Sequence, residues 1–295
     1  MSLKSKISNR LRVFTLDKKP NIYRPSSKPF MSGDSLRKMA DFIFDETQSL
    51  NPKKVKENDI IFLNTGLKEL FFELYHPLIN NKYILITHNH DDSINKADFK
   101  FIDEKIVHWF AAKLDAEPNE KISPIAYGLE NKRYLKNGLK RNFKRLSISD
   151  VNNIEKSNQV LCSFNVYSNP LIREPLLKIA ENRKDLITIK NFQKSKSYLE
   201  ELSTYLYNLC PEGNNFESHR IWESLIFRTT PIVIKNLVNT NFYNLGVPLI
   251  MLDRWEDLNS ITKQDLELLN KVNKNKDYEK FSELKYWTST INEKK

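Results

Sequence analysis

The chain has 295 residues, of which 40% are hydrophobic and 11% aromatic, and its 47 basic and 37 acidic side chains give a net charge of +10. This length and apolar content predict about two packed domains and exclude a disordered chain. No apolar run approaches the ~20 residues of a membrane-spanning helix, and residues 1–12 lack the apolar core of a signal peptide, so we expect a cytoplasmic protein.

The first half of the chain alternates short apolar runs with helical patterns. The runs are continuous and rich in β-branched and aromatic residues, as buried parallel strands are. They predict strands at residues 12–16, 60–64, 83–87 and 106–110. Apolar residues spaced three or four apart predict helices at residues 35–48 and 67–78. This alternation predicts a doubly wound α/β layer.

Polar and titratable side chains fill residues 88–93, directly after the predicted strand 83–87. Ligands of open α/β sheets sit at the carboxyl ends of strands, and a carboxylate or imidazole there can act as a general base. We expect Asp91 to be that base, with His88 as the second choice. Two alternatives stay open: a turn in which Asp92 or Ser93 caps a helix, or a metal pair formed by the His-x-Asp-Asp sequence.

A polar, basic stretch over residues 136–157 separates this pattern from a second one. Its cationic run at 136–145 suits phosphates or anionic lipid headgroups, although a solvated linker would look the same. The second alternation predicts strands at 160–164, 186–189 and 206–210 and helices at 170–181 and 195–202. The cysteines, Cys162 and Cys210, lie in apolar surroundings, which predicts buried thiols rather than disulfides or a zinc site.

Residues 210–235 have the pattern of a turn, a helix and a buried strand. A helix that begins near Phe216 would place His219, Arg220 and Glu223 on one face and an apolar stripe on the other. Helix N-terminal amides and a guanidinium both favour a diphosphate. Glu223, one turn on, is placed for the hydroxyls of a ribose. The alternative is a solvated Arg–Glu pair with no ligand.

These motifs resemble the C-terminal half of exostosin-like glycosyltransferases, in order and in spacing, over about residues 198–258. The matching motifs are PEGN at 211–214, HRIWESL at 219–225, TPIV at 230–233, PLI at 248–250 and DRW at 253–255. The resemblance implies a GT-B fold, in which two Rossmann-like domains face a cleft and the C-terminal one binds a nucleotide-sugar donor. Glu212 departs from the basic or small residue common in relatives, and we expect it to point away from the phosphates or to face an acceptor.

The resemblance also implies a division of the chain and a set of partners. Residues 1–145 would form the acceptor domain, 146–275 the donor domain, and 276–295 a helix that packs back on the first domain. Arg220 would bind the donor diphosphate and Glu223 the ribose, beside a loop of Gly213, Asn214, Asn215 and Phe216 and the nearby His219.

The expected reaction is transfer of a sugar, with inversion, from a nucleotide-diphosphate sugar to a glycan, lipid-linked or small-molecule hydroxyl. The diphosphate charge is met by protein cations, so we expect neither a metal nor another cofactor. Peripheral contact with an anionic membrane is a further expectation.

We expect other residues to have secondary roles in this scheme. Arg173 follows a strand-to-helix crossover and could reach the diphosphate from the opposite wall, as could Lys235, which otherwise lies in solvent. Residues 124–129 resemble the turn that closes the N-terminal half in the family, where Gly128 would allow a positive φ or simply an ordinary turn. His108 and Trp109 are predicted to be core residues.

The net positive charge also permits a different class of protein. The chain would then be a non-catalytic polyanion or nucleic-acid binding protein with an α/β fold. No helix-turn-helix signature, RNP motif or zinc finger accompanies the charge, so no nucleic-acid partner is expected. Affinity that falls steeply with salt would distinguish such a binder from an enzyme.

Overall fold

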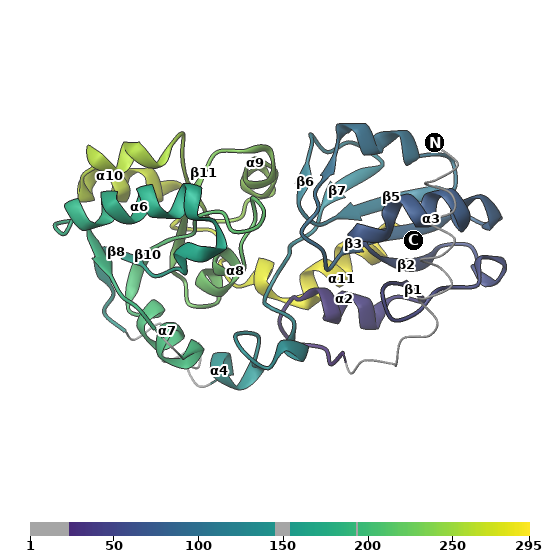
Figure 1. Cartoon of the computed structure of the whole chain (residues 1–295), viewed down its shortest axis with the longest axis horizontal. Helices are drawn as coiled ribbons and strands as arrows, with labels where there is room; N and C mark the ends of the chain where they lie inside the picture. Colours follow the sequence, from purple (N-terminus) through teal and green to yellow (C-terminus); the bar gives the residue numbers. More distant parts are fainter. Residues whose placement is uncertain (1–23, 145–153, 193) are drawn as a thin grey trace.

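The computed structural model describes residues 24–144, 154–192 and 194–295 (Figure 1). The predicted strand at 12–16 lies outside these ranges. Two five-stranded parallel sheets dominate the described residues. The chain is therefore a mixed α/β protein with Rossmann-like sheets, as its alternating pattern predicts.

The first sheet has the strand order β1-β2-β3-β5-β7, and every neighbouring pair is parallel. Its strands are β1 (Phe42–Phe44), β2 (Asp59–Asn64), β3 (Tyr83–His88), β5 (Ile106–Ala111) and β7 (Ile122–Pro124). A small parallel pair, β4 (Ile94–Asn95) and β6 (Leu114–Asp115), lies beyond them. Residues 24–144 are called the first half of the chain below. The helices within them are α2 (Gly33–Met39), α3 (Lys68–Leu74) and α4 (Lys140–Lys144). The middle strands β2, β3 and β5 are buried almost throughout, which explains why their sequences are mostly apolar.

The helix predicted at residues 35–48 is wrong beyond residue 39. α2 ends there because Ala40 takes an extended conformation, with φ −72° and ψ 146°. Phe42–Phe44 then joins the sheet as β1, in parallel register with residues 61–63 of β2. Aromatic and β-branched residues favour this pairing, which the helical spacing of the same residues concealed. Asp45 bridges back to Gln48 after the strand.

The second sheet has the order β12-β11-β10-β8-β9, again parallel throughout. Its strands are β8 (Ser157–Cys162), β9 (Ile187–Ile189), β10 (Tyr205–Leu209), β11 (Thr230–Ile234) and β12 (Ile250–Leu252). Residues 154–192 and 194–295 are called the second half of the chain below. The helices within them are α6 (Pro170–Asn182), α7 (Ser195–Leu202), α8 (His219–Ile226), α9 (Leu237–Asn244), α10 (Lys263–Asn270) and α11 (Leu284–Asn292). Short 3₁₀ turns occupy Pro52–Lys54, Thr65–Leu67, His76–Leu78, Lys96–Phe101, Lys132–Tyr134, Val166–Ser168, Trp255–Asn259, Lys271–Asn273 and Lys280–Ser282.

Figure 1 shows the two sheets beside each other, with α8 and the yellow α11 towards the middle of the molecule. A segment near the end of the chain contacts residues 29–31 there: the Met31 amide donates to Ser282 O (2.7 Å) and the Leu284 amide donates to Pro29 O (2.8 Å). Trp287 of α11 also packs edge-on against Trp222 of α8. The boundaries predicted at 145/146 and 275/276 stay predictions.

Trp222 forms the centre of an aromatic cluster behind α8. Its ring is 0% exposed and lies 5.0 Å from Phe242 and 6.4 Å from Trp287, both in edge-on geometry. This packing fixes one face of α8, so the opposite face is left for other contacts. Among the residues that the structure describes, every helix is too short or too polar to cross a membrane.

Candidate functional site

A cavity of about 950 Å³ lies between the two halves of the chain. Its volume is at the upper end of the range of small-molecule sites in proteins. The first half contributes Asp91, Lys113, Tyr127, Glu130 and Asn137 to its lining. The second half contributes the loop after β8, the starts of α6 and α7, and most of residues 213–223.

The structure brings most of the predicted site residues to this cavity. Its lining includes Asp91, Arg173, Gly213, Asn214, Asn215, His219, Arg220 and Glu223. His88 and Phe216 are not part of it, and neither is Lys235. The sequence therefore identified one side of the cavity well, whereas most of the side that the first half provides was missed.

The helix expected to begin near Phe216 begins at His219 instead. The loop before it is held by its own contacts, because the Gly213 amide donates to Asn215 O (3.1 Å) and the Phe216 amide donates to the side chain of Asn215. These two amides are therefore engaged. Ser218 is the N-cap residue of α8, yet its side chain makes no capping hydrogen bond, and its buried Oγ has no partner among the described residues. The amino end of α8 is thus left uncapped in the cavity lining.

Arg220 lies in the first turn of α8 with part of its guanidinium unused. Its Nε donates to Ser163 O (2.9 Å), and the guanidinium carbon lies 6.0 Å from the Tyr198 ring centroid. Neither Nη atom has a hydrogen-bond partner among the described residues. Since the side chain lines the cavity, both Nη groups remain for an anionic ligand.

Glu223, one turn further along α8, is a buried carboxylate with no hydrogen bond to any described residue. Its side chain lines the cavity although the residue is only 5% exposed. Burial raises its pKa to about 7, against the opposing effect of the Arg220 charge. A desolvated carboxylate of this kind is costly unless a ligand supplies hydrogen-bond donors.

Arg173 lines the cavity, but most of its N–H groups donate to backbone carbonyl oxygens. It donates from Nε to Glu212 O (2.9 Å), from Nη1 to Asn165 O (2.7 Å) and from Nη2 to Pro211 O (3.1 Å). Burial also lowers its pKa to about 10. A Cβ on Gly213 would come within 3.3 Å of Nη2, so this glycine lets the loop close around the guanidinium. Arg173 therefore shapes the loop before α8, with two of its five N–H groups unassigned.

Glu212, the residue that departs from the family pattern, is buried away from the cavity. Its Oε2 accepts a hydrogen bond from Trp255 Nε1 (3.3 Å), and it is absent from the cavity lining. The first of the two orientations expected for it, pointing away from the phosphates, agrees with this geometry.

Asp91 lies at the cavity but both of its carboxylate oxygens are paired. Oδ1 accepts from Lys113 Nζ (3.0 Å) and Oδ2 from Asn214 Nδ2 (3.1 Å). Partial burial would raise its pKa, but the Lys113 charge and these hydrogen bonds outweigh burial and hold the pKa below its ordinary value. A paired carboxylate with a lowered pKa is a weak proton acceptor.

His88, the second base expected from the sequence, lies beneath the cavity wall. Its Nδ1 accepts from the Asn89 amide (2.7 Å) and its Nε2 donates to Ala126 O (3.1 Å), so neither nitrogen is available. Burial lowers its pKa to about 3. The Tyr127 ring stacks over it at 4.9 Å and separates it from the cavity.

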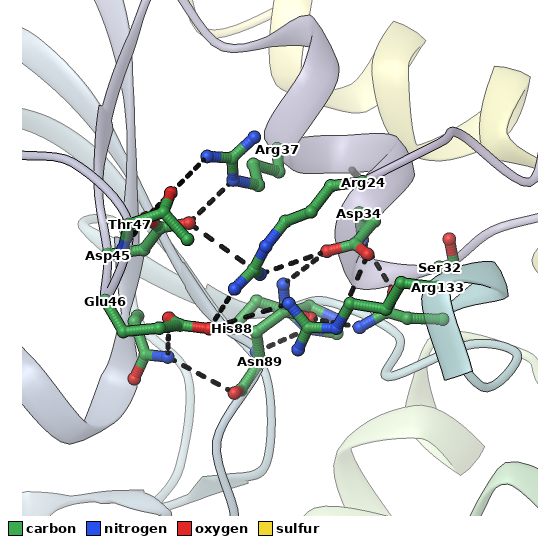
Figure 2. A network of polar contacts seen from close by, with 12 residues as sticks. Arg24, Ser32, Asp34, Arg37, Asp45, Glu46, Thr47, His88, Asn89 and Arg133 are labelled. Carbon is green, nitrogen blue, oxygen red and sulfur yellow. Dashed lines mark hydrogen bonds and ion pairs between the residues drawn. The ribbon is translucent and has the colours of Figure 1, made fainter. Parts of the chain in front are cut away.

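The strand ends next to His88 hold a buried charge network (Figure 2). Arg24 lies within 3.4 Å of Asp34 and 3.7 Å of Asp45, and it also pairs with Glu46. Arg133 lies 3.7 Å from Asp34. Asn89 Nδ2 donates to Asp34 (3.0 Å), Asn131 Nδ2 donates to Asn89 (2.8 Å), and Arg37 pairs with Asp45 (2.6 Å). The contacts of this network join α2 to the ends of β1 and β3. Because three arginines balance the charges of three acids, the network gives no net charge to the cavity.

The side chains that the sequence did not reveal join the two halves. Glu217 Oε1 accepts from the Tyr127 amide (2.7 Å) and from Trp222 Nε1 (2.8 Å). The Tyr127 ring lies under Lys113 Nζ, 4.0 Å away, and stacks on His219 at 4.8 Å. The sequence indicates the turn at 124–129 through Gly128, which takes a positive φ of 70°. The contacts of this turn with Glu217 and His219, 90 and 91 positions later, leave no local signal in the sequence.

Metal ligands do not gather in this part of the molecule. Within residues 24–144, 154–192 and 194–295, no group of three or more His, Cys, Asp or Glu side chains is arranged to hold an ion. Both cysteines are free and buried, and burial raises the pKa of each thiol to about 12. His108 and Trp109 are core residues, as predicted.

No protein-family model and no curated protein matches the chain. Among solved structures, the crystal structure of a GtfA/B complex matches it with 12% sequence identity and a TM-score of 0.35, over 82% of this chain. The chain spans 58% of the length of that neighbour. At this level of similarity the match adds nothing to what the elements and the cavity themselves establish.

Proposed function

We propose that the chain is an exostosin-like glycosyltransferase of GT-B arrangement, which transfers a sugar from a nucleotide-diphosphate donor to a hydroxyl acceptor. The observation that carries the proposal is the uncapped amino end of α8 in the cavity. Among the described residues, the buried Ser218 Oγ there has no hydrogen-bond partner, and neither do the two Nη groups of Arg220, two residues on. Helix amides and a guanidinium together form a site for a diphosphate.

The neighbouring side chains suit the other parts of such a donor. The Glu223 carboxylate, which has no hydrogen bond to a described residue, lies one turn beyond Arg220, where it can accept hydrogen bonds from ribose hydroxyls. Arg173 holds the loop before α8 in place and has two N–H groups left for the diphosphate. Charge stabilisation of the departing nucleoside diphosphate by Arg220 and the amides is the main catalytic contribution proposed for this wall.

The acceptor would enter from the wall that the first half provides, near Asp91, Glu130 and Asn137. A single displacement at the anomeric carbon inverts its configuration. Since protein cations meet the diphosphate charge in this scheme, we propose a reaction without metal or other cofactor. Glycans, lipid-linked sugars and small hydroxyl compounds are the acceptor classes proposed.

We propose that the chain works in the cytoplasm, in peripheral contact with an anionic membrane. The contact would be made by an exposed tip at Tyr134 and Leu135, which are 54% and 69% exposed. Lys136 and Arg141 are exposed next to it, and Leu135 and Arg141 line a second cavity of about 520 Å³. Apolar tips flanked by cations bind the headgroup region of anionic bilayers.

Co-sedimentation with vesicles tests this contact. Binding should appear with phosphatidylcholine vesicles that contain phosphatidylserine and should be absent with phosphatidylcholine alone. Leu135→Ser should weaken it, while Leu268→Ser, a change at a leucine of α10 that is 60% exposed, should not. Equal loss in both variants would argue against a contact at the tip.

Nucleoside diphosphate binding tests the donor site. UDP, GDP, dTDP, ADP and CDP are titrated by calorimetry, with and without Mg²⁺. Hydrogen bonds to a charged group contribute about 1.5–3 kcal/mol, so Arg220→Ala should weaken the best nucleotide ~10–150-fold. Arg254→Ala removes a guanidinium that is 74% exposed and outside the cavity lining, and it should leave affinity unchanged. Normal nucleotide affinity in Arg220→Ala would refute the donor site.

A further inference from the structure

The imidazole of His219 is held in one position where the two halves of the chain contact each other. Its Nδ1 lies 2.6 Å from Gly128 O, and its ring stacks on Tyr127 with centroids 4.8 Å apart and planes 20° apart. A carbonyl oxygen only accepts hydrogen bonds, so Nδ1 carries the proton of this contact. The tautomer is thereby fixed, and in the neutral ring Nε2 holds the lone pair.

Nε2 has no hydrogen-bond partner among the described residues, and the ring lines the cavity. None of the other four histidines combines these properties. Both ring nitrogens are paired in His76, His88 and His108. His90 is exposed, pairs with Asp92 and lies outside the cavity lining. His219 therefore combines a place in the cavity lining with a lone pair on Nε2 that can accept a proton.

The groups that face His219 keep this lone pair unprotonated. Burial lowers the pKa of its imidazole, and the charges of Lys113 and Arg220 act in the same direction. The hydrogen bond to Gly128 O and the charge of Glu130, from the segment after Gly128, oppose them, and His88 lies behind the Tyr127 ring. The imidazole is therefore neutral at pH 7, which is the form that can accept a proton.

We propose that His219, rather than Asp91 or His88, is the general base that activates the acceptor, an assignment that rests on the proposed function. The acceptor hydroxyl gives its proton to Nε2 while its oxygen bonds to the anomeric carbon of the donor sugar. The bond from that carbon to the diphosphate oxygen breaks, and the nucleoside diphosphate leaves with the electron pair. The imidazolium then returns its proton to solvent. Tyr127 and Gly128 are positioning residues in this scheme.

Two substitutions at His219 separate a base from a structural contact. His219→Asn keeps an N–H near the place of Nδ1, so it can still donate to Gly128 O, but it has no atom at Nε2. His219→Gln places an amide near Nε2 and gives up the bond to Gly128. Loss of a general base costs about 10²–10⁴-fold in rate.

The assay follows nucleoside diphosphate release from a panel of UDP-, GDP-, dTDP- and ADP-sugars by the whole chain, with a mixture of simple sugars as acceptors. His219→Asn should release product about 10²–10⁴-fold more slowly, bind nucleoside diphosphate as the wild type does, and lose the rise of rate with pH below 6.5. Imidazole added to His219→Ala should restore part of the rate. His90→Gln is the control and should behave as the wild type.

Carbethoxylation with diethyl pyrocarbonate, followed by peptide mass spectrometry, adds a readout that needs no donor, because this reagent attacks unprotonated imidazole nitrogens. His219 should be modified and should be protected by nucleoside diphosphate. His90 should be modified without protection. The buried, paired His76, His88 and His108 should stay unmodified.

The outcomes distinguish two failures. Wild-type rates in His219→Asn, or an unreactive His219 in the folded protein, would overturn the base assignment and leave the donor site standing. Absence of turnover and of nucleotide binding in the wild type would overturn the proposed function and the catalytic role with it.

Discussion

The buried carboxyl of Glu217 should make the protein less stable as the pH rises from 4.5 to 7. The residue is 4% exposed, and burial raises its pKa from the ordinary 4.5 to about 7, although the Tyr127 amide, Lys113 and the Trp222 indole oppose this. Between these two pH values the folded state retains a proton that the unfolded chain has released. Stability that is fully present below pH 4.5 is therefore lost as the pH rises through 7.

The size of the effect follows from the two pKa values. At 1.36 kcal/mol for each pKa unit, the rise from 4.5 to about 7 corresponds to about 3 kcal/mol lost above pH 7. Glu223 is buried in the same way, its pKa is also raised to about 7, and it contributes with the same sign. A comparison that changes Glu217 alone cancels the contribution of Glu223.

Glu217→Gln provides that comparison. Its side-chain carbonyl can accept the same two hydrogen bonds, from the Tyr127 amide and from Trp222 Nε1, but it does not titrate. Urea unfolding at pH 5 and pH 8 should show the wild type losing up to about 3 kcal/mol more than the variant. Glu200→Gln, at a carboxyl that is 49% exposed, should follow the wild type. Parallel pH dependence in wild type and Glu217→Gln would refute the reasoning.

Three further substitutions test the packing and the cavity. Trp222→Ala removes the centre of the aromatic cluster and should cost about 3–5 kcal/mol in urea unfolding, because its ring is fully buried. Arg173→Met removes the donors that bind three backbone carbonyls, so it should weaken nucleoside diphosphate binding in calorimetry through disorder of the loop before α8. Asp91→Asn removes the carboxylate that pairs with the buried Lys113 and should lower the melting temperature, yet transfer should stay within about tenfold of wild type if His219 is the base.

The sequence predicts those parts of the fold whose signal is local. Strands β2, β3 and β5 are found to within about a residue, because parallel strands buried on both faces are predominantly apolar. The helix predicted over 35–48 fails where β1 pairs with β2, since the same apolar residues fit both periodicities and the partner strand decides. Local propensity does not show whether these residues form a helix or a strand.

The residues of the cavity likewise divide into those that a local sequence pattern indicates and those that it does not. Arg220 and Glu223 are found because they share a face of one helix, and helical spacing is visible in the sequence. Lys113 and Glu217 are missed because their role depends on contacts with residues far along the chain. His219 is found as a cavity residue, but its fixed tautomer comes from Gly128 O, which only the folded chain brings to it.

The short segment from Asn214 to His219 carries part of the cavity lining and several contacts between the two halves. Asn214 and Asn215 donate to Asp91 and Ser93, Glu217 accepts from Tyr127, and His219 contacts Gly128. The uncapped start of α8 lies at the end of this same segment.

We expect a ligand bound at the amino end of α8 to act on these contacts as well, and a change in the contacts to act on the ligand, because the two share one stretch of backbone. The separate bonds from Asn241 Nδ2 to Leu114 O and Ala116 O, each 2.9 Å, also join the two halves without touching the cavity. The bonds from the Met31 amide to Ser282 O and from the Leu284 amide to Pro29 O join the halves away from the cavity as well, so we expect a ligand to act on only some of the contacts that set the position of the halves.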